Sequence, residues 1–197
     1  MGSVSPWRSD FCNAAIILFL SLPNPSMDFF ETVSGRRSIR AFQKKQVDAK
    51  AIRRILDAAN LAPSAGDIQA YWITVVRDER AKEELAAAAI DQGFVAEAPV
   101  VLVFSADKKQ SEARYGERGY DLYAIQDATI AAAYCQLAAA ALGLGCVWVG
   151  AFDTLEVSRI INAGEHELPI AIMPMGYPAE RPKWTGRKEL KELVREI

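Results

Sequence analysis

The sequence is poor in the residues that bind metals and form disulfides. It contains one histidine, His166, and three cysteines, Cys12, Cys135 and Cys146, with no CxxC pair. A single histidine excludes a histidine-rich metal site, and an odd cysteine count predicts neither a disulfide framework nor a zinc site. We therefore expect no metal and a reducing, cytoplasmic environment. Any redox chemistry must then be supplied by a bound molecule.

Excess charge and long hydrophobic runs are lacking too. Lysine and arginine number 23 against 25 acidic residues, a net charge of -2, so no long-range field favours nucleic acid or an anionic membrane. The apolar run from Ala14 to Leu22 is too short to cross a bilayer. Hydrophobic residues make up 51% of the 197, which is the composition of a globular domain. We expect one domain with no nucleic-acid or membrane partner.

The first 26 residues differ from the rest of the chain. Asp10 interrupts the approach to the apolar run, Pro23 and Pro25 follow it, and no small-x-small cleavage site of a secretory signal is present. We expect residues 1–26 to be a disordered or non-native N-terminal extension, with Met27 as the natural start. Residues 27–197 would then form the functional domain.

Periodicity and turn residues predict a chain in which helices and strands alternate. Helices are expected over residues 27–34, between the N-cap Asp48 and Pro63, over 79–90 and 121–142, after Asp153 and at the C-terminus; strands are expected over 71–76, 99–104, 146–150 and 168–175. Gly35 is expected to cap the first helix at positive φ, and residues 105–120 to form a polar surface excursion or lid. Alternation alone favours a parallel sheet, but the connections leave strand direction open.

A cluster of donors follows the first predicted helix. Within six residues, Gly35 to Arg40, the chain places three guanidinium groups and a hydroxyl, those of Arg36, Arg37, Arg40 and Ser38. A guanidinium is always charged and presents a planar fork of donors that suits phosphate. A solvated basic run at a helix end is the alternative, and the cluster alone does not decide between them.

Three further motifs follow the arginine cluster. They are the loop Ala62-Pro63-Ser64-Ala65-Gly66-Asp67-Ile68-Gln69, the turn from Gly143 to Phe152, and Gly176-Tyr177-Pro178 followed by Arg187. In this order the four motifs resemble the nitroreductase family of FMN-dependent oxidoreductases, from Met27 to the C-terminus. The resemblance implies an α+β fold with a mixed central sheet flanked by helices. It also implies a domain-swapped homodimer with one FMN at each of two sites on the subunit interface.

The resemblance also assigns cofactor-binding residues. Arg36 and Arg187 would hold the FMN phosphate, Arg37 and Ser38 would contact phosphate, ribityl or ring edge, and Arg40 would lie near flavin N1 and O2. From the other subunit the flavin would be lined by Pro63, Ser64, Ala65, Asp67 and Gln69. The backbone of Val149, Gly150 and Ala151 would face N5 and O4. This sequence departs from the family pattern at Asp67, where asparagine is common, and at Ala70 and Tyr71, where proline and tryptophan are common.

Elementary chemistry supports these assignments. A phosphate at an interface is costly to bury unless it is paired, so two arginines from distant segments are a reasonable requirement. A cation at Arg40 would stabilise the negative charge of a reduced flavin, and glycine at 150 would let the backbone approach the ring. Gln92 is either a further flavin contact or an exposed amide. Cys146 and Trp148 are expected to be core residues rather than redox groups.

The implied activity is an FMN-dependent NAD(P)H oxidoreductase. NAD(P)H would deliver hydride to flavin N5 and leave, and a small electron-poor aromatic such as a nitro compound or quinone would then take the electrons, in a ping-pong cycle. No catalytic acid or base is identified. Of Tyr115, Tyr120 and Tyr123, one is expected to contact substrate. Alternatives are a specialised flavin reductase or dehalogenase of the same fold, a non-catalytic flavin-binding protein, or a structural module whose basic cluster is solvated.

Overall fold

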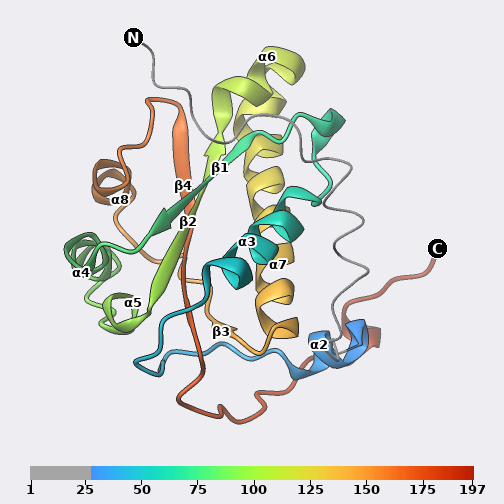
Figure 1. The fold of residues 1–197 in the computed structure, drawn as a ribbon. Coiled ribbons are helices and arrows are strands. Elements are labelled where there is room, and N and C mark those ends of the chain that lie inside the picture. The colour runs from blue at the N-terminus through green and yellow to red at the C-terminus, as the bar shows by residue number, and fades with distance from the viewer. Residues whose placement is uncertain (1–27) are drawn as a thin grey trace.

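The computed structural model describes residues 28–197, so the expectation for residues 1–26 lies outside the described residues. In chain order the elements are α2 (Phe29–Gly35), α3 (Ala49–Asn60), the 3-10 turn η1 (Ala65–Asp67), β1 (Tyr71–Val76), α4 (Glu79–Ala88), α5 (Phe94–Glu97), β2 (Val100–Asp107), α6 (Lys108–Arg118), the π-helical turn η2 (Gly119–Tyr123), α7 (Ala124–Ala141), β3 (Gly145–Cys146), α8 (Thr154–Ile160), β4 (Glu167–Gly176) and the 3-10 turn η3 (Leu190–Glu192) (Figure 1).

The sheet has the strand order β1-β2-β4-β3, and its named strands pair antiparallel. A parallel component enters through an isolated bridge between Ser38 and Cys146, beside β3. Strands β2 and β4 lie in the middle because their residues are nearly all apolar and can be covered on both faces. The expected α+β fold is confirmed. The parallel arrangement that simple alternation favours is not adopted by the named strands.

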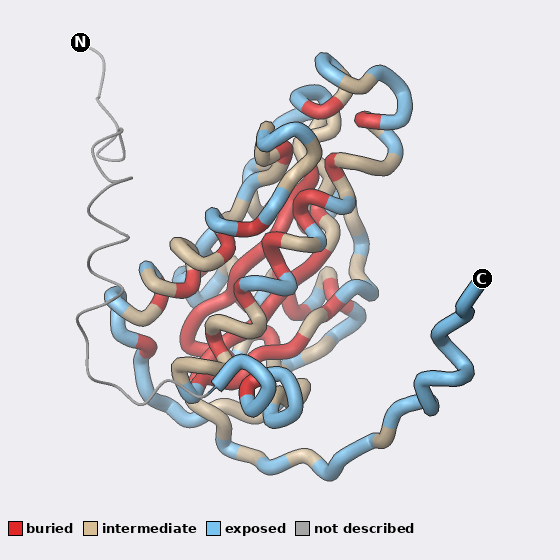
Figure 2. Tube along the Cα trace, turned by 90° about the vertical axis from the view of Figure 1, so that its right-hand side faces the viewer, coloured by how far each residue is buried: buried red, intermediate tan, exposed pale blue. Residues whose placement is uncertain are grey.

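Helices cover both faces of this sheet (Figure 1). Leu102 and Phe104 of β2 face the side occupied by α3 and α7, whereas Val101 and Val103 face the side of α4, α5 and α8. This division follows from the two-residue period of a strand. In Figure 2 the buried trace runs through the sheet and the facing sides of the helices, and the C-terminal tail is almost entirely exposed.

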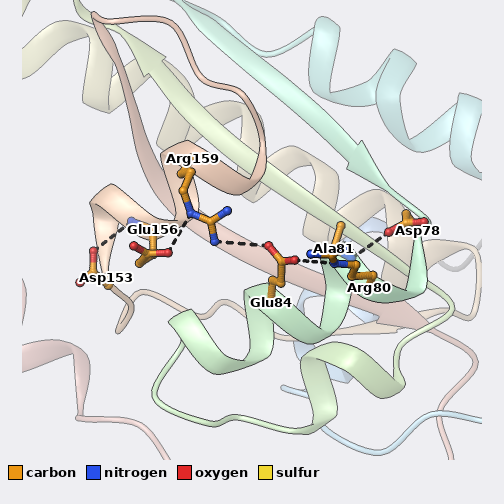
Figure 3. A network of polar contacts seen from close by, with 7 residues as sticks. All are labelled: Asp78, Arg80, Ala81, Glu84, Asp153, Glu156 and Arg159. Atoms are coloured by element: carbon orange, nitrogen blue, oxygen red, sulfur yellow. Dashed lines mark hydrogen bonds and ion pairs between the residues drawn. The ribbon is translucent and has the colours of Figure 1, made fainter.

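On the face of the sheet covered by α4, α5 and α8, a network of charged side chains connects α8 to α4 (Figure 3). Glu84 accepts from Arg80 Nε at 3.0 Å and from Arg159 Nη2 at 3.3 Å, and Arg159 Nε donates to Glu156 at 3.0 Å. Asp153 caps α8 by accepting from the backbone N–H groups of residues 155 and 156. Because these charged groups are paired with one another, we interpret the network as a contact between helices rather than a binding site.

Several local predictions are confirmed. Strand β1 has the expected bounds, Asp48 caps α3 by accepting from the Lys50 N–H, and Val47 and Ile52 are both buried as a hydrophobic staple requires. Helix α7 is the long central helix that the alanine-rich stretch predicted. Cys146 is buried and Trp148 packs against the same core cluster, as expected.

Other local predictions are wrong for identifiable reasons. Gly35 is the last residue of α2 and does not adopt positive φ; instead the Arg37 guanidinium donates to the Ser34 carbonyl at 2.6 Å and satisfies the helix end. Residues 105–120 belong to regular elements, because β2 runs on to Asp107, whose side chain caps α6; a role of this segment as a lid stays a prediction. The strand expected over 146–150 is reduced to β3 and a bridge from Val149 to Ile172.

Candidate functional site

The arginine segment is held in place by backbone hydrogen bonds on two sides. The Ile39 N–H donates to the Cys146 carbonyl at 3.1 Å, and the Ala179 N–H donates to the Ala41 carbonyl at 2.9 Å. The Glu180 carboxylate accepts from the N–H groups of Arg40 and Ala41. The segment therefore lies between β3 and the C-terminal tail, two parts of the chain that sequence alone does not bring together.

Beside this segment is a cleft of about 670 Å³. The end of α2, the turn after α7 and the tail line it, through residues that include Thr32, Arg36, Arg37, Gly145 and Arg181. Gly145 is required there, since a Cβ at this position would lie 2.6 Å from the Ile39 side chain. The buried Thr32 hydroxyl has no hydrogen-bond partner among residues 28–197. The cleft thus offers several cations to a ligand.

Arg36 and Arg37 in the cleft, and Arg187 near it, are not neutralised by nearby acids. Within the described part of the chain, Arg36, Arg37 and Arg187 form no ion pair with a carboxylate. Arg36 and Arg37 are half-buried. Clustered guanidinium groups repel one another unless an anion lies between them, so this arrangement suits a phosphate.

Arg187 reaches this region through an aromatic ring. Its guanidinium carbon lies 4.9 Å from the centre of the Trp184 ring, and that of Arg37 lies 4.6 Å from the same centre. Arg187 does not line the cleft, but Arg37, which contacts the same Trp184 ring, does. The structure thus brings Arg37 near Arg187 on one ring, whereas the predicted pairing of Arg36 with Arg187 at a phosphate stays a prediction. Contact of any of them with FMN stays a prediction.

Arg40 points toward a second group of candidate residues. Its guanidinium carbon lies 6.0 Å from the centre of the Phe94 ring, at the start of α5. Just before α5, Gln92 donates to the Ala151 carbonyl at 3.5 Å and to the Ala89 carbonyl at 2.7 Å. Arg40 and Ala151 thus both contact the segment of residues 92–94, Arg40 through Phe94 and Ala151 through Gln92. Gln92, left open between two roles above, acts here as an anchor for Ala151.

Backbone geometry also shapes the segment from Val149 to Ala151. Val149 is buried and exchanges two backbone hydrogen bonds with Ile172 of β4, at 2.9 and 3.0 Å. Gly150 and Ala151 then emerge into solvent. This arrangement presents two backbone amides from a rigid base, as a ring-binding segment requires.

The loop with Pro63, Ser64, Ala65, Asp67 and Gln69 is rigid and unusual in its backbone. Gly66, Asp67 and Gln69 have φ of 56°, 58° and 50°, the left-handed region that few non-glycine residues adopt. Side chains hold the loop: Ser64 Oγ accepts from the Gln69 N–H at 3.0 Å, and the buried Asp127 accepts from the Ala65 N–H at 2.9 Å. The side chain of Asp67 is exposed and available to a ligand.

Helix α6 covers this loop. Arg114 donates to the Gly66 carbonyl at 2.9 Å and Gln110 to the Ile68 carbonyl at 2.7 Å. Sequence reasoning did not single out either residue, because their segment was expected to be an irregular excursion. Any side chain at Gly66 would collide with Tyr115, whose hydroxyl would lie 2.1 Å from a Cβ there.

The three candidate substrate tyrosines do not lie together. Tyr115 and Tyr123 form an edge-to-face pair with ring centres 5.2 Å apart, close to the loop. Tyr120 instead packs against Lys108, whose amine lies 3.8 Å from its ring centre. Tyr115 and Tyr123 are therefore better placed than Tyr120 to meet a ligand that touches the loop.

Within one chain, the loop lies near the start of α7, whereas α2, whose end lines the arginine cleft, lies beside the end of α7 (Figure 1). The loop is tied to Asp127 near the start of α7, and the cleft includes Ala140 near its end. Thirteen residues of helix separate these positions, which is roughly 20 Å at 1.5 Å per residue. Within one chain, these two groups of predicted site residues therefore lie far apart.

The described cysteines take no part in such a site. Cys135 and Cys146 are buried and unpaired, and burial raises the pKa of the Cys146 thiol to about 12, against a smaller opposing effect of the Arg36 charge. The thiol is therefore protonated and unreactive, as expected. Among residues 28–197 no group of histidine, cysteine and acidic residues could hold a metal ion, and no helix is long and apolar enough to cross a membrane.

Comparison with known proteins identifies the family of this chain. The nitroreductase family model matches residues 33–95 and 87–177. A protein of Thermus thermophilus named NADH dehydrogenase is 34% identical over 86% of this chain and 96% of its own length. The NADPH-flavin oxidoreductase of Vibrio harveyi is 28% identical over 84% of this chain and 72% of its own length.

Solved structures show the same similarity in three dimensions. The NADPH:FMN oxidoreductase from Vibrio harveyi, solved as a complex with NAD+, superimposes with a TM-score of 0.79 and 27% identity, over 85% of this chain and 76% of that chain. The match to the family model and the relatives with which the chain shares its length and fold agree on one family. The chain belongs to the nitroreductase family.

Proposed function

We propose that this protein is an FMN-dependent oxidoreductase that takes electrons from NAD(P)H and passes them to a small electron-poor aromatic acceptor. Membership of the nitroreductase family supports the reaction class, and relatives named FMN reductase and NADPH-flavin oxidoreductase support both cofactors. The observation that carries the proposal is the cleft beside Arg36 and Arg37, to which Trp184 joins Arg187, with no carboxylate paired to these three cations in the described chain.

The residues of the cleft fit a phosphate monoester. Arg36 and Arg187 would supply charge-assisted hydrogen bonds to the phosphate, and Arg37 and Ser38 would contact the phosphate, the ribityl chain or the ring edge. Arg181, which the sequence reasoning did not assign to the cofactor, adds a further cation to the lining of the cleft. A dianion bound here would relieve the repulsion among the guanidinium groups.

A second set of residues would position the ring. Arg40 would stabilise negative charge at N1 and O2, and the backbone of Val149, Gly150 and Ala151 would face N5 and O4. When bound, FMN would supply the two-electron chemistry, accepting hydride from NAD(P)H and reducing the second substrate in a ping-pong cycle. The protein's own contribution is orientation and electrostatics, and no side-chain acid or base is required of it.

A second copy of the chain would complete the site. The loop that contains Pro63, Ser64, Ala65, Asp67 and Gln69 lies near the start of α7, away from the cleft at its end, and would line the flavin from the partner. Exposed apolar residues provide a surface for pairing: Leu190, Leu193, Val194 and Ile197 in the tail are each more than half exposed. A homodimer whose tail embraces the partner would bury them.

The acceptor would lie against tyrosine side chains. Tyr115 and Tyr123 stand beside the flavin-lining loop and could stack on a nitro compound or quinone. Tyr120 remains a weaker candidate, because Lys108 occupies one side of its ring. We also propose a cytoplasmic location, because the described cysteines are free thiols, as a reducing compartment favours.

Anaerobic spectroscopy tests the proposal. Purified protein loaded with FMN should show a flavin spectrum that NADH or NADPH bleaches and that a quinone or nitroaromatic restores. Bound flavin that resists reduction would indicate a non-catalytic flavin-binding protein. Release of halide from a halogenated aromatic, without turnover of quinones, would indicate the dehalogenase alternative. Protein that takes up no FMN would contradict the proposal altogether.

A further inference from the structure

Besides the hydrogen bonds made by Ala179 and Glu180, the tail contacts the arginine segment through the side chain of Trp184. The guanidinium carbons of Arg37 and Arg187 lie 4.6 and 4.9 Å from the centre of its ring. The ring is 56% exposed, so burial in a core does not explain its position. The two cations on it come from segments that lie 150 positions apart in the sequence.

The other bonds of Arg187 are all local. Its Nη1 donates to the Gly186 carbonyl at 2.6 Å and to the Thr185 hydroxyl at 3.4 Å. The tail at this point is irregular, and Gly186 adopts φ of 73°. Within the described chain, Arg187 makes no hydrogen bond or ion pair with the arginine segment. The indole is therefore the physical link that holds Arg187 in place.

Such a link matters because Arg37 and Arg187 carry like charges. Without a ligand they repel each other, and the tail would gain entropy by moving away. The electron-rich face of an indole attracts a guanidinium and is the strongest of the aromatic partners for one. A ring that holds two guanidinium groups therefore offsets part of their repulsion before any anion arrives.

We propose that Trp184 is a positioning residue that organises the phosphate end of the FMN site. This inference rests on the proposed function and adds to it the reason why the cations are assembled in advance. Ordering charged side chains on binding is costly, so a site ordered beforehand binds more tightly. Because the effect acts on the phosphate end, it must distinguish FMN from riboflavin, which has the same ring system and no phosphate.

The experiment compares four full-length proteins freed of flavin: wild type, Trp184→Ala, Trp184→Phe and Trp72→Phe. Trp72 is a matched control, since its ring is 55% exposed and its indole N–H binds Asp107, away from the arginines. Dissociation constants for FMN and for riboflavin are measured by flavin fluorescence, and circular dichroism confirms folding.

We expect Trp184→Ala to weaken FMN binding by about five- to thirtyfold, the range expected from two exposed cation–π contacts, and riboflavin binding by less than about twofold. Trp184→Phe should lie between, and Trp72→Phe should match wild type. Unchanged FMN affinity in Trp184→Ala overturns the inference, as does an equal loss for both flavins, which would indicate ring stacking. Wild type that binds neither flavin overturns the proposed function itself.

Discussion

The carboxylate of Asp127, buried inside α7, accepts a hydrogen bond from the backbone N–H of Ala65 at 2.9 Å. This bond fastens the left-handed loop to the central helix. The second oxygen of Asp127 is buried and has no partner among residues 28–197. Asp127 therefore sets where the proposed flavin-lining loop lies.

Removing this carboxylate should destabilise the protein. In Asp127→Ala the Ala65 N–H loses its acceptor, and we expect a loss of about 1–3 kcal/mol in the free energy of unfolding. Asp127→Asn retains an acceptor oxygen and should lose less. Urea unfolding of both variants measures the difference, with Asp121→Asn, an exposed carboxylate change, as the control. Equal stability of Asp127→Ala and wild type would contradict this account.

A side chain at Gly66 should disrupt the loop. A Cβ there would lie 2.1 Å from the Tyr115 hydroxyl and would sit at φ of 56°. We expect Gly66→Ala to lower the free energy of unfolding by roughly 1–3 kcal/mol. Thermal unfolding measures the loss. The matched control is Gly93→Ala, where φ is negative and no atom lies within 4 Å, and that variant should unfold like wild type.

Arg36→Ala should reduce the retention of FMN. The variant removes a charge-assisted partner of the phosphate, an interaction of about 1.5–3 kcal/mol, which corresponds to a dissociation constant larger by roughly 10- to 150-fold. Equilibrium dialysis with FMN gives the number directly. Arg80→Ala, which removes an exposed arginine of α4 far from the cleft, serves as the control. Affinity within error of wild type would remove Arg36 from the phosphate site.

Complementation between variants should show that the site is shared by two chains. Arg36→Ala damages the arginine side, and Asp67→Lys is designed to damage the loop side. Each variant alone should lose activity. After the two are unfolded together and refolded as mixed dimers, one site per mixed dimer regains both intact halves, so about a quarter of wild-type activity should return. Mixed dimers without recovered activity would place both halves of the site in one chain.

Alkaline pH should destabilise the protein through its buried thiols. Burial raises the pKa of Cys146 from its usual 9.0 to about 12, and it raises the pKa of Cys135 in the same direction. The folded state therefore keeps protons that the unfolded state loses. Stability is unaffected below pH 9 and falls as the pH rises from 9 toward 12, by at most about 1.4 kcal/mol per pH unit for each thiol.

Urea unfolding across that pH range checks this expectation. Cys146→Ala should have a lower stability at pH 7 and a shallower decline above pH 9. A decline as steep as that of wild type would assign the pH dependence to other groups, among them Tyr71, whose pKa burial also raises.

Local patterns predicted the elements whose causes are local. The cap at Asp48, the apolar face of α3 and the alternation of β1 depend on neighbours within a few residues. The α6 segment was misjudged because its cap, Asp107, was not recognised and its hydrophobic residues are few. The order of the four motifs identified the family, and the match of the family model confirmed it.

By itself, the sequence determined the family through the order of four short motifs, and the fold class through that resemblance, because such motifs are local in the chain. Only the tertiary structure decided which residues meet. It placed Arg187 with Arg37 on the Trp184 ring, set Arg114 on the Gly66 carbonyl, and separated the loop from the arginine cleft by the length of α7. These relationships join segments far apart in the chain, and packing and charge in three dimensions fix them.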